Sequence, residues 1–485
     1  MICDNCQQKF NISKQDQEYY KSFNVPEPTW CPDCRKMRRL SMRNERTFYQ
    51  RRCDFCNKDI IAYYPKKSHQ VVYCPECWYS DSWDPNNFSK DFNFEKPFFE
   101  QFKALYKIVP TLSLDVVNCE NSQYVSYCGD DKSCYYDIAG EANEQCFYGK
   151  FVKYSKDCVD NSFVYNSELC YECVNCHNCY GSTWLTLCYD CDHCHNCYDL
   201  KGCSHCINCT NLRNQSFCID NKQYSQEEYE KIKNKIKFKN NKKIIKYSNQ
   251  TNSENCTGND ITNSKNCSDC FDIVNCENSK WLWDVLDAKD CYDLNFSLYK
   301  PEHSLELIST LNMVNCKFCN ASHYCHDMEY CDKCNNSHDC FGSIGITKGE
   351  YIILNQQYSE AEYKKLKQKI IDQMIKTGEY GQFFPEGTSG FKHEETVASE
   401  YYPKNKDNHN TCDHKYKIIK QEKEFYQKMN LPEPENCPKC RHKNRNIRAG
   451  KRELIRNKCL NCGKNLLTPY QGDIYCETCY NKKVY

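Results

Sequence analysis

The sequence predicts a mainly β protein in which duplicated terminal double zinc-ribbon modules flank a cysteine-rich β-solenoid with short capping helices. Three observations lead to this fold class. Cysteine pairs near both ends have the spacing of zinc knuckles. Cysteines in the middle fall on a six-residue grid, and a short fixed period is typical of stacked coils. Two capping boxes precede apolar helical faces, and helices can cover the exposed end of a solenoid.

Length, charge and cysteine content limit the class of protein. The chain has 485 residues, 43 cysteines and a formal net charge of zero, so no global field steers it toward nucleic acid or an acidic membrane. No run approaches the roughly 18 apolar residues of a membrane span, so we expect no membrane partner. A metal knuckle opens at Cys3 and leaves no room for a signal peptide, so we expect reduced thiols and a cytoplasmic location.

The chain is too long for one compact core, and its patterns divide it into five segments. They are an N-terminal double zinc ribbon (1–80), a linker with a capping helix (81–115), a first cysteine-rich solenoid with a capping helix (116–247), a second such solenoid (248–400) and a C-terminal double zinc ribbon (401–485).

The two ends of the chain are copies of one module. Positions 1–56 align without gaps on positions 407–462, where Cys3 is replaced by His409. Zinc accepts histidine in place of cysteine, whereas a disulfide does not. The last pair, Cys74 and Cys77, returns as Cys476 and Cys479 after a slightly shorter loop. The repeat therefore indicates metal ligands.

Cysteine spacing predicts two four-ligand sites in each module. The interval between Cys56 and Cys74 falls within the roughly 15–20 residues typical of a zinc ribbon. The interval between Cys6 and Cys31 is longer, and it has the same length in both copies. Four thiolates close a tetrahedron and leave no position for water, so we expect about four structural Zn²⁺ ions per chain. His414 is an alternative to His409. The expected ligands are Cys3, Cys6, Cys31, Cys34, Cys53, Cys56, Cys74, Cys77, His409, Cys412, Cys437, Cys440, Cys459, Cys462, Cys476 and Cys479.

Between the two ribbons of each module lies a basic connector. Its cations could meet a phosphate backbone, so RNA, DNA or a ribonucleoprotein is the expected partner. The alternatives are a solvated basic face and a face paired with acids elsewhere in this neutral chain. The expected nucleic-acid contacts are Arg35, Arg38, Arg39, Arg43, Arg46, Arg51, Arg52, Arg441, Arg445, Arg448, Arg452 and Arg456.

The middle of the chain predicts two related solenoids. A coil length of either 12 or 18 fits the grid from Cys128 to Cys218, and each copy ends in a capping box, Ser225 with Glu228 and Ser359 with Glu362. A further helix from Pro97 is expected to cap the first solenoid.

The middle cysteines have two interpretations. They pack inside the coils, or runs such as Cys170 to Cys179 hold iron–sulfur clusters or extra zinc. Alignment of the two copies places Cys218 opposite Ile352 and Cys203 opposite Ser337, which favours packing because isoleucine cannot be a ligand.

The chain resembles a group of uncharacterised cysteine-rich zinc-ribbon proteins of reduced bacterial genomes, some of which carry a CaiB/BaiF, or coenzyme A transferase, label. The likeness rests on the basic ribbons and on segments 25–34, 80–84, 96–102 and 377–385. The resemblance implies zinc binding. No residue here matches a transferase site.

The leading functional hypothesis is a zinc-binding, non-enzymatic scaffold that engages nucleic acid through its connectors. Protein–protein assembly is the alternative, since 38 tyrosines suit interfaces. An iron–sulfur redox protein or a coenzyme A transferase is a third hypothesis. Because the sequence has no phosphate loop or nucleophile elbow, we expect no enzymatic activity.

Overall fold

The computed structural model describes residues 1–297, 299–404, 412 and 415–485. The chain forms two compact units, each built from two separate stretches. Unit 1 consists of Met1–Ser113 and Ser248–Asn405, and unit 2 consists of Leu114–Tyr247 and Lys406–Tyr485. Unit 1 therefore joins the N-terminal module to the second solenoid, and unit 2 joins the first solenoid to the C-terminal module.

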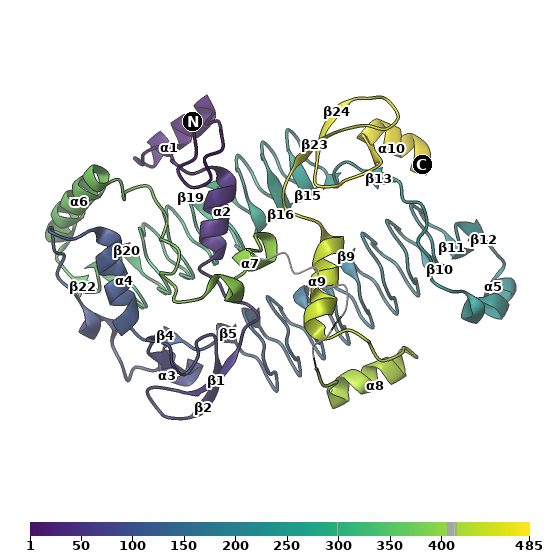
Figure 1. The fold of residues 1–485 in the computed structure, drawn as a ribbon, viewed down its shortest axis with the longest axis horizontal. Helices are drawn as coiled ribbons and strands as arrows, with labels where there is room; N and C mark the ends of the chain where they lie inside the picture. Colours follow the sequence, from purple (N-terminus) through teal and green to yellow (C-terminus); the bar gives the residue numbers. More distant parts are fainter. Residues whose placement is uncertain (298, 405–411, 413–414) are drawn as a thin grey trace. The chain divides into compact units, whose positions relative to one another are not determined.

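Both solenoids are built from 12-residue coils (Figure 1). In unit 2, parallel bridges join residues twelve apart, as in Glu120 to Lys132 and Lys132 to Glu144. Of the two coil lengths that the sequence allowed, 12 is therefore the observed one. Unit 1 departs from this period at an 11-residue step from Gln250 to Ile261 and at a 13-residue step from Lys289 to Glu302.

Each coil is a series of three-residue steps. In unit 2 the first residue of a step forms the bridge, the second is left-handed and the third points inward, as in Lys132, Ser133 (φ 55°) and Cys134. Many of the left-handed residues are Asn or Asp, which tolerate this conformation better than other side chains. The step explains the six-residue cysteine grid, because inward positions recur every third residue.

The strands and helices of the solenoids follow this plan. Unit 2 has β5 (Val116–Val117), β6 (Cys128–Gly129), β7 (Lys150–Lys153), β8 (Ser162–Tyr165), β9 (Val174–His177), β10 (Ser204–Ile207), β11 (Ser216–Ile219), β12 (Lys222–Gln223), α5 (Gln226–Ile232), η2 (Lys233–Lys235) and β13 (Ile245–Lys246). Unit 1 has β14 (Gln250–Thr251), β15 (Gly258–Thr262), β16 (Cys270–Val274), β17 (Trp283–Leu286), β18 (Lys289–Tyr292), β19 (Glu302–Leu305), β20 (His338–Phe341), β21 (Glu350–Ile353), β22 (Gln356–Gln357), α6 (Glu360–Thr377), η3 (His393–Glu395) and α7 (Ala398–Tyr401).

The modules contain short helices and two-stranded sheets. The N-terminal module and the segment after it have α1 (Lys14–Ser22), α2 (Pro32–Leu40), β1 (Tyr49–Arg52), β2 (Asp59–Ala62), β3 (Val72–Tyr73), α3 (Pro75–Trp78), η1 (Pro85–Phe88), α4 (Phe98–Ile108) and β4 (Thr111–Leu112). The C-terminal module has α8 (Lys420–Lys428), α9 (Pro438–Ala449), β23 (Ile455–Lys458), β24 (Asn465–Thr468), β25 (Ile474–Tyr475) and α10 (Glu477–Val484). The antiparallel pairs β1–β2 and β23–β24 are equivalent, and the expected mainly β fold with a solenoid is confirmed.

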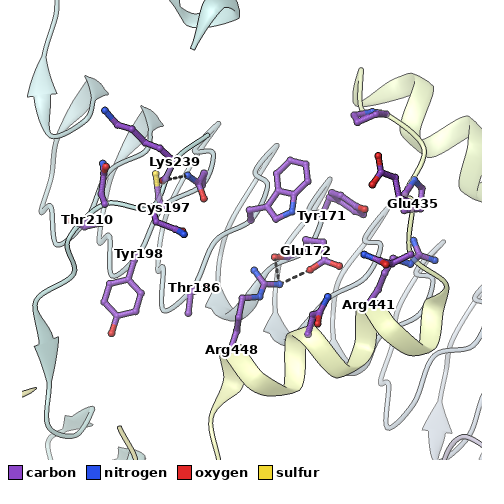
Figure 2. A pocket seen from close by; sticks show the side chains of 18 of the residues that line it. Tyr171, Glu172, Thr186, Cys197, Tyr198, Thr210, Lys239, Glu435, Arg441 and Arg448 are labelled. Carbon is purple, nitrogen blue, oxygen red and sulfur yellow. Dashed lines mark hydrogen bonds and ion pairs between the residues drawn. The ribbon is translucent and has the colours of Figure 1, made fainter. Parts of the chain in front are cut away.

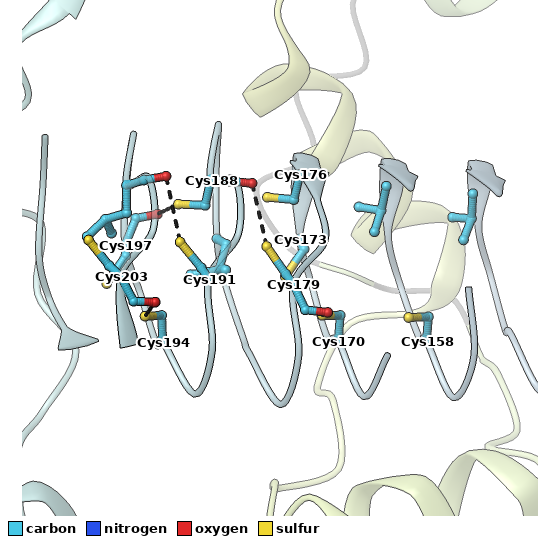
Figure 3. Packing of buried hydrophobic residues seen from close by; sticks show 14 of the residues in the cluster. Cys158, Cys170, Cys173, Cys176, Cys179, Cys188, Cys191, Cys194, Cys197 and Cys203 are labelled. Atoms are coloured by element: carbon cyan, nitrogen blue, oxygen red, sulfur yellow. Dashed lines mark hydrogen bonds between the residues drawn. The ribbon is translucent and has the colours of Figure 1, made fainter. Parts of the chain in front are cut away.

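The inward thiols bond to the backbone of the coils (Figure 3). Cys128 Sγ donates to the carbonyl of Ser126 two residues back and to that of Asp137 nine residues on, both at 3.3 Å. Ser337 Oγ in the second solenoid bonds to Asn335 O and Ile346 O in the same register. Cysteine and serine are therefore interchangeable inward donors, which accounts for Ser337 opposite Cys203.

Both solenoids end in the same way. The chain turns back into an antiparallel strand, β12 or β22, and an asparagine side chain takes the place of the missing next coil. Asn355 Nδ2 donates to Ile344 O at 2.9 Å and its Oδ1 accepts from Ile344 N at 2.8 Å, and Asn221 does the same for Thr210. The expected capping boxes then start α5 and α6.

The helix expected to cap the first solenoid is placed differently. Phe98 of α4 lies 5.2 Å from the ring of Tyr330 and 5.4 Å from that of Phe341, both in the second solenoid. The prediction for this helix is wrong because the N-terminal module packs with the second solenoid, a choice that the order of segments along the chain does not reveal.

Candidate metal centres and the arginine helices

Four cysteine clusters lie in the terminal modules, and the sulfur atoms of each lie within 4.8 Å of one another. In each of the three complete clusters one pair of sulfurs is 3.7 or 3.8 Å apart. A tetrahedron with metal–sulfur bonds of about 2.3 Å has edges of about 3.8 Å, so this spacing fits a bound ion. The clusters are Cys3, Cys6, Cys31 and Cys34; Cys53, Cys56, Cys74 and Cys77; Cys459, Cys462, Cys476 and Cys479; and Cys412, Cys437 and Cys440.

The fourth cluster has three described ligands. The expected fourth ligand, His409, and its alternative, His414, lie outside the described residues. The remaining fifteen expected ligands all fall in these clusters, as the spacing predicted. Sulfur-rich tetrahedral sites of this kind suit Zn²⁺, and the clusters can hold metal ions without an open coordination position.

One backbone hydrogen bond recurs in every cluster. In the three complete clusters the N–H of the third cysteine donates to the sulfur of the first at 3.2 or 3.3 Å. In the fourth cluster the N–H of Cys437 donates at 3.2 Å to Cys412, which aligns with the second cysteine of the first cluster, Cys6. The donor and acceptor pairs are Cys31 and Cys3, Cys74 and Cys53, Cys437 and Cys412, and Cys476 and Cys459. The three complete sites therefore share one local geometry, and the fourth differs from them in the cysteine that accepts the bond.

These bonds prepare the first cysteine as a thiolate. Burial raises the pKa of Cys3, but hydrogen bonds from the backbone at Cys6 and Cys31 outweigh it and lower the pKa to about 6. The same balance lowers the pKa of Cys53 to about 7 and that of Cys459 to about 6. Each complete cluster therefore offers one sulfur whose pKa lies at or below neutral pH, which favours the thiolate, the form that binds metal.

The last two cysteines of each cluster open a helix. Cys31, Cys74, Cys437 and Cys476 are the N-cap residues of α2, α3, α9 and α10. The positive end of the helix dipole then faces the thiolates and stabilises them. A metal bound at the cluster consequently fixes the first turn of the helix.

In unit 1, α2 runs from its cysteine cluster onto the second solenoid. Arg35 follows the ligand Cys34, and its guanidinium lies 2.8 Å from the carboxylate of Asp293. One turn later, Arg39 lies 3.3 Å from Glu306. Their side chains are at most 3% exposed, and both acids are left-handed corner residues. The arginines are therefore committed to a buried ion-pair network.

In unit 2, α9 repeats this contact on the first solenoid. Arg441 follows the ligand Cys440 and lies 2.5 Å from Asp160, while Arg445 lies 2.6 Å from Asp160 and 3.0 Å from Glu172. Asp160 and Glu172 are again left-handed, with φ of 56° and 55°. The duplication has therefore preserved the metal site, the helix and its acidic partners together.

Aromatic side chains surround both networks. The guanidinium of Arg35 lies 4.8 Å from the ring of Trp281, and that of Arg441 lies 5.0 Å from the ring of Tyr148. Burial would lower the pKa of Arg441, but Asp160, Tyr426 and Glu422 outweigh it and raise the pKa above its ordinary value. Both arginines therefore stay charged, and such buried charges need their partners.

The twelve arginines expected to contact nucleic acid fall into three groups. Arg46 and Arg448 are half-buried, and Arg52 and Arg456 are exposed. The other eight are buried, which contradicts a solvated basic face and agrees with the alternative of pairing within the chain: Arg35, Arg38, Arg39, Arg43, Arg51, Arg441, Arg445 and Arg452. Phosphate contact by most of these groups would first require the loss of their carboxylate partners.

Sequence reasoning missed the acidic partners. Asp160 and Glu172 lie one coil apart, and Asp293 and Glu306 lie one coil apart at the matching place in the second copy. The sequence feature that could have identified these partners is a pair of acids spaced one coil apart, which occurs in both copies.

A further possible ion site lies on the wall of the first solenoid. Asp192, His193 and His205 bring three ligand atoms within 4.8 Å of one another. His193 and His205 are neighbours on successive coils and stack with ring centres 5.2 Å apart, and Phe217 follows His205 at 5.0 Å. Ring stacking between successive coils accounts for the closeness of His193 and His205 without a metal.

Comparisons with known proteins give no family. No protein-family model matches the sequence, and no curated protein matches it. Among the helices of the described residues, none combines the length and apolar character needed to cross a bilayer.

Proposed function

We propose that this chain is a zinc-stabilised, non-enzymatic scaffold in which a metal cluster fixes the start of a helix that fastens each terminal module to a solenoid. The observation that carries the proposal is the adjacency of ligand and ion pair. Arg35 directly follows Cys34, and Arg441 directly follows Cys440. An ion that orders the cysteine pair therefore also orders the arginine that contacts the solenoid.

The donor set supports zinc as the metal. Thiolate sites with a tetrahedral edge of about 3.8 Å suit Zn²⁺, and four protein ligands make such a site structural. Binding of this kind can contribute about 10 kcal/mol to folding of a small module. We propose His409 as the fourth ligand beside Cys412, Cys437 and Cys440.

In this proposal the connector arginines act within the chain, where they fasten each helix to its solenoid. Arg39 and Arg445 are each within 3.4 Å of carboxylates of the solenoid. Contact of the connectors with RNA, DNA or a ribonucleoprotein, and assembly with other proteins, stay predictions.

Metal analysis of two matched variants tests the proposal. The purified full-length chain is expected to hold about four zinc ions. Cys53→Ser removes a ligand and is expected to lower the content to about three, whereas Cys203→Ser, the same change at an inward thiol, is expected to leave it at about four. A folded, metal-free protein would overturn the zinc assignment. Equal metal loss in both variants would assign metal to the solenoid thiols instead.

A further inference from the structure

The segment that begins in the last turn of α5 carries a row of lysines. Residues 231–253 contain eight lysines and no Asp or Glu. We call residues 231–246 the lysine strap, and its lysines are Lys231, Lys233, Lys235, Lys237, Lys239, Lys242, Lys243 and Lys246. This concentration of charge is absent from the corresponding part of the second copy, residues 365–405, which contains acids throughout.

Most of the strap's charge is uncompensated. Lys233, Lys239 and Lys246 pair with Glu230, Asp220 and Glu477. Among the described residues, the other five lysines are in no ion pair, and all five are exposed: Lys231, Lys235, Lys237, Lys242 and Lys243. Unlike the eight buried connector arginines, these cations are available to a ligand.

The first solenoid holds the strap backbone in a fixed position. Asn208 Nδ2 donates to Lys237 O at 3.0 Å, and Asn196 Nδ2 donates to Lys239 O at 2.9 Å. Asn211 both donates to Ile244 O and accepts from Ile244 N, each at 2.9 Å. A row of charges that is already ordered loses little entropy when it binds.

A pocket of about 540 Å³ opens beside the strap (Figure 2). Lys239 and Lys243 line it together with the rings of Tyr171, Trp184 and Tyr198. Five amide side chains complete much of the lining: Asn196, Asn240, Asn241, Asn436 and Asn444. The volume falls within the range of small-ligand pockets, and an aromatic wall with amides suits a planar base with hydrogen-bonding edges.

We infer that the lysine strap and the adjoining pocket form a binding site for single-stranded nucleic acid. The phosphates follow the exposed lysines, and an unpaired base enters the pocket against the aromatic wall. Stacking of this kind tolerates any base, so the site is not sequence-specific. The inference does not rest on the proposed metal scaffold, because solenoid asparagines hold the strap.

Other features of the site agree with this ligand. Glu433 and Glu435 line the pocket, and Figure 2 shows Glu435 on the opposite side from Lys239, so the phosphates are expected on the strap side. Ile236 packs with Ile207 and Ile219 of the solenoid. Within the strap, which the structure describes throughout, Phe238 is the one exposed large apolar side chain, 48% exposed, and its ring centre lies 5.1 Å from that of Trp184. A single exposed ring offers little apolar surface for insertion into a bilayer, which favours nucleic acid over an anionic membrane.

Binding of a fluorescent 12-nucleotide RNA to the full-length protein over a range of salt concentrations tests the charge contacts. For a single strand, the slope of log affinity against log salt is about −0.7 per phosphate neutralised. The variant K235Q/K237Q/K242Q is therefore expected to bind more weakly with a slope shallower by about 2. The control K365Q/K369Q/K376Q removes three exposed lysines from α6 and is expected to match the wild type.

Tryptophan fluorescence tests the pocket. Trp184 is the one tryptophan in the sequence of unit 2, so quenching by RNA that is lost in W184F reports a base in the pocket. Unchanged binding by the strap variant would overturn the proposal. Equal affinity for a duplex of the same length would also overturn it, as would binding to phosphatidylserine vesicles without binding to RNA.

Discussion

The guanidinium of Arg445 donates to the carboxylate of Asp160 at 2.6 Å across 285 residues of sequence, and neither side chain is exposed. The same helix begins at a cysteine cluster, so one element joins a metal site to the side of a solenoid. Arg39 and Glu306 make the equivalent contact in the other unit. This arrangement and the interior of the coils lead to four testable expectations.

Removal of the Arg445 side chain should destabilise unit 2. Arg445→Met leaves Asp160 buried with one fewer cation, and breaking a buried ion pair in this way costs about 3–5 kcal/mol. Arg456→Met, at an exposed position, should change the free energy of unfolding by less than about 0.5 kcal/mol. Urea unfolding followed by circular dichroism measures both. Similar free energies of unfolding for the two variants would contradict a stabilising ion pair between Arg445 and Asp160.

Removal of metal should release the arginine helices. Arg39 and Arg445 are fully buried, so trypsin should not cut after them in the metal-loaded protein. A chelator that strips the clusters disorders the first turn of α2 and α9, and cleavage should then appear within residues 35–39 and 441–448. Exposed Arg52 serves as the control that is accessible in both states. Mass spectrometry of the fragments identifies the cleavage sites. An unchanged cleavage pattern after metal loss would show that the order of these helices does not depend on metal at the clusters.

The first solenoid should become more stable when Asp131 is neutralised. Burial raises the pKa of Asp131 to about 6, so the folded state favours the protonated acid. The stability that the protonated Asp131 side chain contributes to the folded state is fully present below pH 4 and is lost as the pH rises through 6. Asp131→Asn should therefore raise the free energy of unfolding by up to about 3 kcal/mol at pH 7, because each unit of pKa shift corresponds to about 1.4 kcal/mol. At pH 4 the same substitution should change the free energy of unfolding little.

Asparagine suits this position because Asn143 occupies the same place one coil later. Asn143 N donates to Asp131 Oδ1 at 3.0 Å, and Ser155 N donates to Asn143 Oδ1 at 3.1 Å. Urea unfolding from pH 4 to 7 measures the effect, with Asp130→Asn at an exposed position as the control. A difference that does not vary with pH would rule out titration of Asp131.

Loss of the Asn355 amide should weaken the end of the second solenoid. Asn355→Ala leaves the buried N–H and carbonyl of Ile344 without these partners, at a cost of about 1–3 kcal/mol for each group left unpaired. Asn336→Ala is a matched control, because both residues are left-handed, with φ of 63° and 47°, and Asn336 is exposed. Amide hydrogen exchange at Ile344 should rise only in the first variant. Equal effects would mean that backbone strain, not capping, explains the loss.

Local features of the fold could be predicted because local spacing causes them. Two cysteines on a knuckle face one ion wherever the knuckle lies, so fifteen of the expected ligands could be assigned before any contact was known. The capping boxes at Ser225 and Ser359 depend on residues three apart and are confirmed. The coil length stayed open, because inward positions recur every three residues and both 12 and 18 are multiples of three.

The connector arginines show where sequence reasoning reached its limit. A cluster of cations such as Arg35 and Arg39 looks the same in sequence whether it faces water or carboxylates. The acids that pair with it lie hundreds of residues away, and nothing local distinguishes Asp293 from other acids at left-handed corners. The lysine strap is just as basic in sequence, yet five of its lysines form no ion pair among the described residues.

By itself the sequence determined the cysteine clusters, the periodic solenoids and their capped ends, since each of these is set by residues close together in the chain. Only the tertiary structure decided which solenoid each module joins and which charges remain exposed. Ion pairing and burial depend on distances in space, and pairs such as Arg35 with Asp293, 258 residues apart, come together only when the chain has folded.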